Sequence, residues 1–419
     1  MNSFQVLDLS QNEFHHLGRN PFIGQVKLRE LNLSSNQVTS LSHKRGSRSH
    51  TFRGPVNLQT LDLSHNLLTS LDNRTFSDLK QLVELKLRSN KLQRISPSAF
   101  SGLARLRMLH LDSNLLETLD RSWLEPLQSL RFLYLSENRF SQLSAKTFQP
   151  LIALRVVDLS ANRLISVEHG TFTRSLDTLD LSHNLLSDVP TLAMAEAQKL
   201  KHLDLSSNPI EQIGPNAFQN LYDLESLKLN YLRDLTSISG HALLDNVRLA
   251  DLSLENCPEL QPLSYGVFAS NTLLKTVGFR NNSWATLSPN QVPINSIREL
   301  RVSGLPFTCN CSLIWLWHLY QVKYLKVQYS TMGFKGLNSF VTLNIFRRTN
   351  FCIIFFLIRF LSFSNQKDFM FSPGIEPGTF CVLDRCDNHY TTKTVYDVGK
   401  ISSKLTLVMT CVIYTCYVI

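Results

Sequence analysis

Leucine recurs along this chain at a fixed period, and the stretch from Leu106 to Asn114 shows the pattern most clearly. It reads Leu-x-x-Leu-x-Leu-x-x-Asn, and subtraction places Asn90, Asn114, Asn138 and Asn162 at intervals of 24 residues. Alternating apolar and polar residues predict a strand whose apolar side chains share one face. The sequence therefore predicts a series of short strands, within residues 82–90, 106–114, 130–138, 154–162, 176–184 and 200–208.

A second apolar position follows ten residues after each of these asparagines or its equivalent, and its members are Phe22, Phe76, Phe100, Leu124, Phe148, Phe172, Met194 and Phe218. We expect them to fill the far side of the core. No single turn of this size buries its apolar face, so neighbouring turns must stack. The period and lettering resemble the leucine-rich repeat family. That resemblance implies an α/β horseshoe solenoid of about 13 turns, with a parallel sheet on the concave face. Mostly turns and short 3-10 segments are expected on the convex face.

The asparagine that closes each pattern can both donate and accept hydrogen bonds through its amide. The family resemblance implies that these side chains bond the backbone of neighbouring turns. Leu232 and Cys257 stand at two later positions where asparagine is expected, and Asn282 restores the series. Cysteine is a known variant at this place. We therefore interpret Cys257 as a buried thiol rather than a redox centre.

The repeats are predicted to span residues 1–308, and a different pattern follows. Cys309-Asn-Cys311, followed by Trp315 and Trp317, resembles the opening of a C-terminal cysteine cap. In such caps both cysteines form disulfides, which makes Cys309 and Cys311 disulfide candidates and indicates an oxidising compartment. The next cysteine, Cys352, lies too far along to be assigned as a partner. A zinc site is disfavoured because no ligand pair follows at finger spacing.

Residues 309–320 are therefore interpreted as the start of a truncated cap, and residues 321–419 as an irregular tail that resembles read-through into mobile-element sequence. The alternative is a membrane anchor at residues 405–419, although a span requires about 20 apolar residues. Residues 1–10 already read as a strand, without an apolar leader before them. We expect an incomplete N-terminus, and the alternative is a cytosolic solenoid.

The formal net charge of +9 is unevenly distributed. Residues 320–419 carry 11 basic and 5 acidic side chains, which leaves the first 319 residues nearly neutral. A nucleic-acid partner favours a basic stripe, so we expect none. Serine, histidine and aspartate occur mainly in the repeated lettering of residues 62–66 and 180–184. That spacing follows the solenoid, so we expect no catalytic triad, metal site, cofactor or enzyme activity.

The outward strand positions carry the candidate binding site. Five turns before residue 210 show an Asp followed two residues later by a Ser, but three consecutive turns among them depart from this lettering. Exposed aromatic residues and methionine beside charges are typical of interface centres. The alternative is sequence drift on an unused surface. We predict that a protein ligand or surface receptor binds the concave patch, defined as Glu84, Lys86, Arg88, Met108, His110, Asp112, Phe132 and Tyr134.

Four sequons make Asn32, Asn73, Asn281 and Asn310 glycosylation candidates, of which Asn73 lies on a turn and is preferred over Asn32. Residues 254–263, 282–284 and the Cys-x-Cys segment resemble insect neuronal surface proteins of the Tartan and Capricious kind. This resemblance implies an extracellular or plasma-membrane protein that acts in recognition and adhesion. The alternatives are a fragment of a Toll-type receptor ectodomain and the targeting repeats of a larger matrix enzyme.

Overall fold

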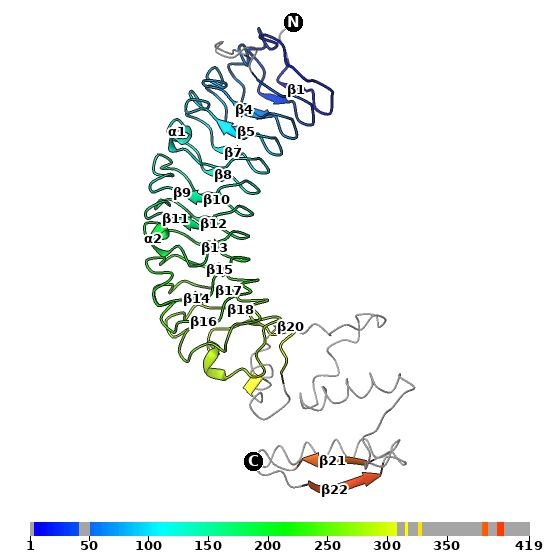
Figure 1. The fold of residues 1–419 in the computed structure, drawn as a ribbon, viewed down its shortest axis with the longest axis vertical. Coiled ribbons are helices and arrows are strands. Elements are labelled where there is room, and N and C mark those ends of the chain that lie inside the picture. Colours follow the sequence, from blue (N-terminus) through cyan, green and yellow to red (C-terminus); the bar gives the residue numbers. More distant parts are fainter. Residues whose placement is uncertain are drawn as a thin grey trace. The chain divides into compact units, whose positions relative to one another are not determined.

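The computed structural model describes residues 4–41, 51–307, 315–316, 326–328, 379–383 and 392–397. The chain divides into two compact units. The first comprises residues 1–284, 290–305 and 326–329, and it is a curved solenoid of stacked turns (Figure 1). The second comprises residues 285–289, 306–325 and 330–419.

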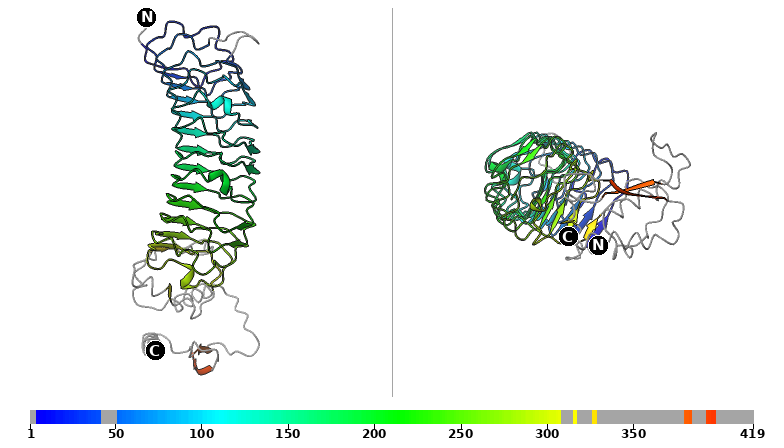
Figure 2. Two further views of the ribbon diagram at one scale, coloured as in Figure 1. Left: turned by 90° about the vertical axis from the view of Figure 1, so that its left-hand side faces the viewer. Right: turned by 90° about the horizontal axis from the view of Figure 1, so that it is seen from below.

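One parallel sheet of 14 strands lines the concave side of the solenoid, one strand from each turn (Figures 1 and 2). Its order is β1-β2-β3-β5-β7-β8-β10-β12-β13-β15-β17-β18-β19-β20. The strand bounds are, in that order, Val6–Asp8, Glu30–Asn32, Thr60–Asp62, Glu84–Lys86, Met108–His110, Phe132–Tyr134, Val156–Asp158, Thr178–Asp180, His202–Asp204, Ser226–Lys228, Asp251–Ser253, Thr276–Gly278, Glu299–Arg301 and Lys326–Gln328.

The alternation of leucine with polar residues sets the register of this sheet. Leu85, Leu109 and Leu133 lie opposite one another in neighbouring strands, and all three are fully buried. In each of these strands the central side chain points into the core, and the side chains of its two neighbours point to the concave side. The predicted fold class, a parallel-sheet horseshoe solenoid, is confirmed.

The buried asparagines bind neighbouring turns together. Asn114 Nδ2 donates to Leu87 O and Leu111 O, both at 3.0 Å. Its Oδ1 accepts from Leu92 N at 3.0 Å, so the side chain bridges its own turn and the preceding one. Cys257 occupies the same place in a later turn, where its Sγ donates to Leu229 O at 3.3 Å.

The convex side consists mostly of turns, together with short regular elements. Among the described residues, these elements are three pairs of two-residue parallel strands, two four-residue helices and one 3-10 helix. The strand pairs are β4 (Ser70–Leu71) with β6 (Arg94–Ile95), β9 (Gln142–Leu143) with β11 (Ser166–Val167), and β14 (Gln212–Ile213) with β16 (Ser237–Ile238). The helices are α1 (Arg121–Leu124), α2 (Thr191–Met194) and η1 (Pro289–Gln291).

A stack of phenylalanine rings fills the convex side of the core. The Phe22, Phe52, Phe76 and Phe100 rings follow one another with centroids 5.7–6.2 Å apart. The predicted apolar positions are all buried. Phe52 was missed by the fixed spacing, because the six extra residues in its turn displace it along the sequence. Helices α1 and α2 occur at the two positions where Leu124 and Met194 replace phenylalanine.

The sheet extends past residue 308, where the sequence predicts that the repeats end. Strand β20 pairs in parallel with β19, and Val327 lies opposite Leu300. A single apolar residue between two polar ones is enough to continue the alternation here. The described part of the second unit contains an antiparallel pair, β21 (Thr379–Leu383) and β22 (Thr392–Asp397).

Candidate functional site

The concave patch lies on three adjacent strands, β5, β7 and β8. Their register places Glu84, Met108 and Phe132 in one row. Lys86, His110 and Tyr134 form the next row, and Arg88 and Asp112 follow just beyond the strands. Neighbouring strands lie about 4.8 Å apart, so the structure brings all eight predicted residues together on one surface.

The patch is less exposed than the alternation predicts. Only Arg88 is exposed, six members are half-buried, and Asp112 is 7% exposed and therefore buried. The expectation that every outward side chain faces solvent is thus wrong for Asp112. Side chains on adjacent turns of a concave sheet stand close enough to cover one another, which the pattern of a single strand does not reveal.

Charges within the patch are largely paired. Arg88 Nε lies 2.9 Å from Asp112 Oδ2, and Lys86 Nζ lies 3.5 Å from Glu84 Oε1. The His110 ring stands between two carboxylates, with Nδ1 3.6 Å from Asp112 Oδ1 and Nε2 3.9 Å from Glu84 Oε1. Both distances exceed an ordinary hydrogen bond, and the buried His110 Nε2 and Asp112 Oδ1 have no hydrogen-bond partner. Two polar atoms of the patch, one on His110 and one on Asp112, therefore remain without a hydrogen bond.

An aromatic pair forms the centre of the patch. The His110 and Tyr134 rings are stacked, with centroids 4.5 Å apart and planes 12° from parallel. Burial raises the pKa of the Tyr134 hydroxyl, and the carboxylates of Asp158 and Asp112 raise this pKa further. The hydroxyl is therefore neutral at physiological pH, and Phe132 presents a second half-buried ring on the same strand.

The ordinary Asp-Ser lettering has a structural role that the patch lacks. Asp180 Oδ1 accepts from Ser182 N at 2.9 Å, which caps the turn after the strand. Burial raises the pKa of the Asp180 carboxyl, and Asp204 and Asp158 raise it too, while hydrogen bonds from Ser182 oppose them. Asp158, Asp180 and Asp204 lie side by side on neighbouring strands, and Lys228 Nζ lies 3.3 Å from Asp204 Oδ2 at one end of this row.

The residue just before each strand was overlooked by the sequence reasoning. Arg107 and Arg131 precede Met108 and Phe132, and both side chains are exposed. Arg131 N donates to Arg107 O at 2.8 Å, so the two arginines are neighbours in adjacent turns. The sequence does contain a signal for them, because Arg107, Arg131 and Arg155 occupy this position in three consecutive turns.

The glycosylation candidates differ in their surroundings. Asn73 is exposed, and only its Oδ1 is engaged, accepting from Ser98 N at 3.1 Å. Asn32 is half-buried on the concave face, and Asn281 Nδ2 donates to Asn256 Oδ1 at 2.9 Å. Asn73 thus remains the best-placed candidate. The candidates Asn310, Cys309 and Cys311 lie outside the described residues.

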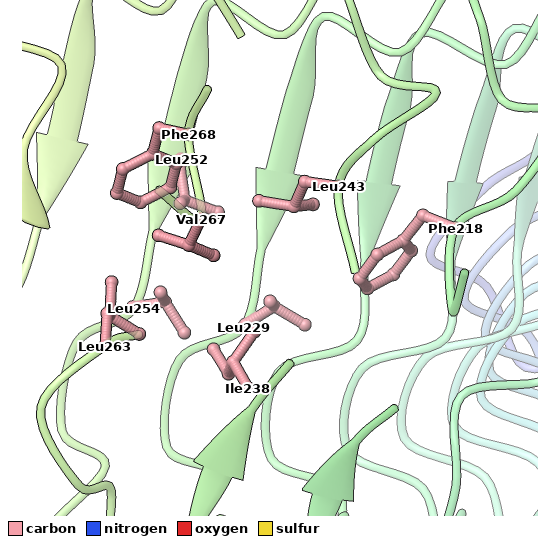
Figure 3. Close-up of a pocket in the computed structure, with 9 residues that line it drawn as sticks. All are labelled: Phe218, Leu229, Ile238, Leu243, Leu252, Leu254, Leu263, Val267 and Phe268. Carbon is pink, nitrogen blue, oxygen red and sulfur yellow. The ribbon is translucent and has the colours of Figure 1, made fainter. Parts of the chain in front are cut away.

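The apolar core offers no room for a small-molecule substrate at the cavity drawn in Figure 3. This cavity has a volume of about 10 Å³, which admits at most about one water molecule. It lies in later turns, where Leu243 takes the place of a phenylalanine ring (Figure 3). Its lining consists of Phe218, Leu229, Ile238, Leu243, Leu252, Leu254, Leu263, Val267 and Phe268.

Two further findings concern the described residues only. No group of three or more His, Cys, Asp or Glu side chains stands close enough there to hold a metal ion. No helix in this part of the chain has the length and apolar character needed to cross a membrane.

Several solved structures have a similar fold. In the TLR13-ssRNA13 complex, TLR13 is 25% identical with a TM-score of 0.57, and the match covers 78% of this chain and 54% of that one. The LRIM1/APL1C complex gives 21% identity and a TM-score of 0.57, covering 81% and 59% of the two chains. An internalin (inlF) of Listeria monocytogenes gives 20% identity and a TM-score of 0.56, covering 79% and 87%. This chain therefore spans about half the length of the TLR13 chain that it matches.

Sequence profiles of two families match the repeats. A profile described as "Leucine Rich repeat" matches residues 25–41. A second, described as "Leucine rich repeat", matches residues 40–92, 56–116, 80–140, 105–164, 152–210 and 198–258. Together they extend over more than half of the 419 residues, and they coincide with the stacked turns described above. The chain belongs to the leucine-rich repeat family.

Proposed function

We propose that the solenoid recognises a protein partner through its concave patch. The observation that carries this proposal is the aromatic cluster of His110, Tyr134 and Phe132 on adjacent strands β7 and β8. Leucine-rich repeat domains typically serve as protein-interaction scaffolds, which supports the class of function. Five other turns carry a capping Asp at this position, whereas these two carry rings that cap nothing, so a partner gives their retention a purpose.

The chemistry of the cluster suits a protein interface. Tyrosine and histidine present both an apolar ring and a polar atom, and such amphipathic rings are favoured at interface centres. Met108 adds a flexible apolar side chain in the same row as Phe132. Arg88 and Lys86 are already paired with carboxylates, so they can form a polar rim without an added desolvation penalty for unpaired charges.

The test is a binding screen of the full chain against an array of purified extracellular protein domains. The double variant Phe132→Ala with Tyr134→Ala is screened beside the unmodified protein. The control is Thr178→Ala with His202→Ala, which truncates two concave positions outside the patch. Signals that disappear in the first variant and persist in the control support the proposal. If every signal survives in both variants, the patch is not the binding surface.

A nucleic-acid partner enters the same screen as a competing outcome. The sequence-based expectation of no nucleic acid has no support among the comparisons, because the TLR13 structure is a complex with single-stranded RNA. Single-stranded RNA is therefore included as a probe. RNA binding that is lost in the patch variant, without any protein signal, would overturn the assignment of a protein partner.

We also propose an extracellular or cell-surface setting and a role in recognition or adhesion. The Cys-x-Cys segment and the exposed sequon at Asn73 support this setting. The competing function is that of a Toll-type receptor ectodomain, which the 25% identity to TLR13 favours. A cell-aggregation assay with the full chain displayed on cells distinguishes the two. Aggregation supports adhesion, whereas ligand-dependent signalling through an attached reporter domain supports a receptor.

A further inference from the structure

Two cations beside the concave patch, Arg107 and Arg131, have no carboxylate partner within the described residues. Arg107 and Arg131 are exposed and stand in adjacent turns, joined by the hydrogen bond from Arg131 N to Arg107 O. Within the described residues, neither guanidinium takes part in an ion pair or a side-chain hydrogen bond. Two like charges in neighbouring turns repel each other, so this arrangement is unfavourable for the isolated solenoid.

In two later turns, the cation at the same position is paired with a carboxylate. Arg155 Nη1 lies 3.1 Å from Asp177 Oδ2 in the next turn, and Lys201 Nζ lies 3.6 Å from Glu225 Oε1. Each of these cations thus has a carboxylate beside it in the following turn, directly before the strand of that turn.

Within the described residues, Arg29, Lys275 and Arg298 hold the same position and also lack an ion pair or a side-chain hydrogen bond, but their turns lie outside the concave patch. Arg107 and Arg131 are therefore the unpaired cations that border the aromatic rings.

The arginines and the rings form one continuous surface. Arg107 directly precedes Met108, and Arg131 directly precedes Phe132. Phe132 N also donates to Arg107 O at 3.0 Å, which holds Arg107 beside the start of β8. A ligand that covers Phe132 and Tyr134 therefore comes within reach of both guanidinium groups.

We propose that the partner presents an acidic segment, with carboxylates that pair with Arg107 and Arg131 and an apolar side chain that packs on Phe132 and Tyr134. This inference rests on the proposed function of the patch. Guanidinium groups bind carboxylates through paired, charge-assisted hydrogen bonds. In an extended segment, alternate side chains share one face and lie about 6.6 Å apart. Two acidic residues separated by one residue therefore match two arginines on adjacent turns.

The experiment uses two libraries of short displayed peptides, selected on the full chain. One library restricts alternate positions to Asp and Glu, the other restricts them to Asn and Gln, and both allow aromatic and aliphatic residues elsewhere. The strongest binders are then measured by fluorescence anisotropy at low and high salt. We expect binders from the acidic library, with affinity that falls as salt screens the exposed charges.

Three variants separate the contributions. Arg107→Gln with Arg131→Gln removes the unpaired cations and should weaken acidic peptides about tenfold. Arg155→Gln with Lys201→Gln removes the same formal charge from paired positions and should leave affinity unchanged. Phe132→Ala with Tyr134→Ala should weaken the same peptides at least tenfold. Thermal unfolding of each variant confirms that it is folded.

The outcomes distinguish this inference from the function on which it rests. If the amide library binds equally well and only the aromatic variant loses affinity, the patch is a binding surface but the acidic partner is wrong. If no selected peptide depends on Phe132 and Tyr134, the proposed function itself fails. If heparin or single-stranded RNA binds through the two arginines while no acidic peptide is selected, the inference is overturned in favour of a different anion.

Discussion

The His110 and Tyr134 rings lie parallel on adjacent strands, with centroids 4.5 Å apart. In other turns the equivalent positions hold Asp180 and Asp204, whose carboxylates accept hydrogen bonds from the backbone N–H groups of Ser182 and Ser206. The stack gives the two rings a contact of their own, so part of their surface is covered before any partner arrives. The patch is therefore preorganised, which reduces the entropy lost when a partner binds.

The inward and outward positions of one strand should differ sharply in stability. Leu109→Ala removes a fully buried side chain and should lower the free energy of unfolding by about 2–5 kcal/mol. Met108→Ala, at the neighbouring half-buried position, should lower it by less than about 1 kcal/mol. Urea denaturation of both variants measures the difference. Equal losses would mean that the core and concave faces are assigned incorrectly.

The buried asparagines should stabilise the solenoid far more than the exposed one. Asn114→Ala removes bonds to Leu87 O, Leu111 O and Leu92 N in a buried setting, which should cost about 3 kcal/mol. Asn12→Ala is the matched control, because Asn12 is exposed and donates only within its own turn. Thermal unfolding should shift strongly for the first variant and little for the second.

The repetition of the sequence explains why most of the fold was predictable. Leu109 and Asn114 recur with the same neighbours, so one turn determines the next. Phe52 escaped prediction because its turn is longer, although its ring joins the same stack. Ring stacking, burial and ion pairing between side chains of neighbouring turns are harder to predict. They depend on contacts between two turns, which the residue pattern of a single turn does not show.

The binding patch shows this limit most clearly. Alternation placed His110 and Tyr134 on the concave face correctly, but their stacking depends on the register between two strands. The burial of Asp112 depends in the same way on Arg88 and His110 in contact with it. Arg107 and Arg131 were overlooked because their lack of partners becomes visible only beside Arg155 and its carboxylate.

The thiol of Cys257 should make stability depend on alkaline pH. Burial raises its pKa from 9.0 to about 11, so the folded protein holds this proton more tightly than the unfolded chain. The resulting stability is present below pH 9 and is lost as pH rises through about 11. A shift of this size corresponds to about 2–3 kcal/mol.

The measurement is the free energy of unfolding of the native protein and of Cys257→Ala across this pH range, at fixed ionic strength. The native protein should lose more stability than the variant as pH rises, because tyrosine and lysine titrate in both. Parallel pH profiles for the two proteins would show that the thiol is not held in a buried, neutral form.

The dissociation constant of the strongest partner for the variant Phe132→Ala with Tyr134→Ala tests the central claim most directly. Hot-spot residues contribute about 2 kcal/mol or more each, so binding should weaken at least tenfold relative to the native protein. The midpoint of thermal unfolding should change little, since both rings are only half-buried. An unchanged dissociation constant in a folded variant would contradict the assignment of the concave patch as the binding surface.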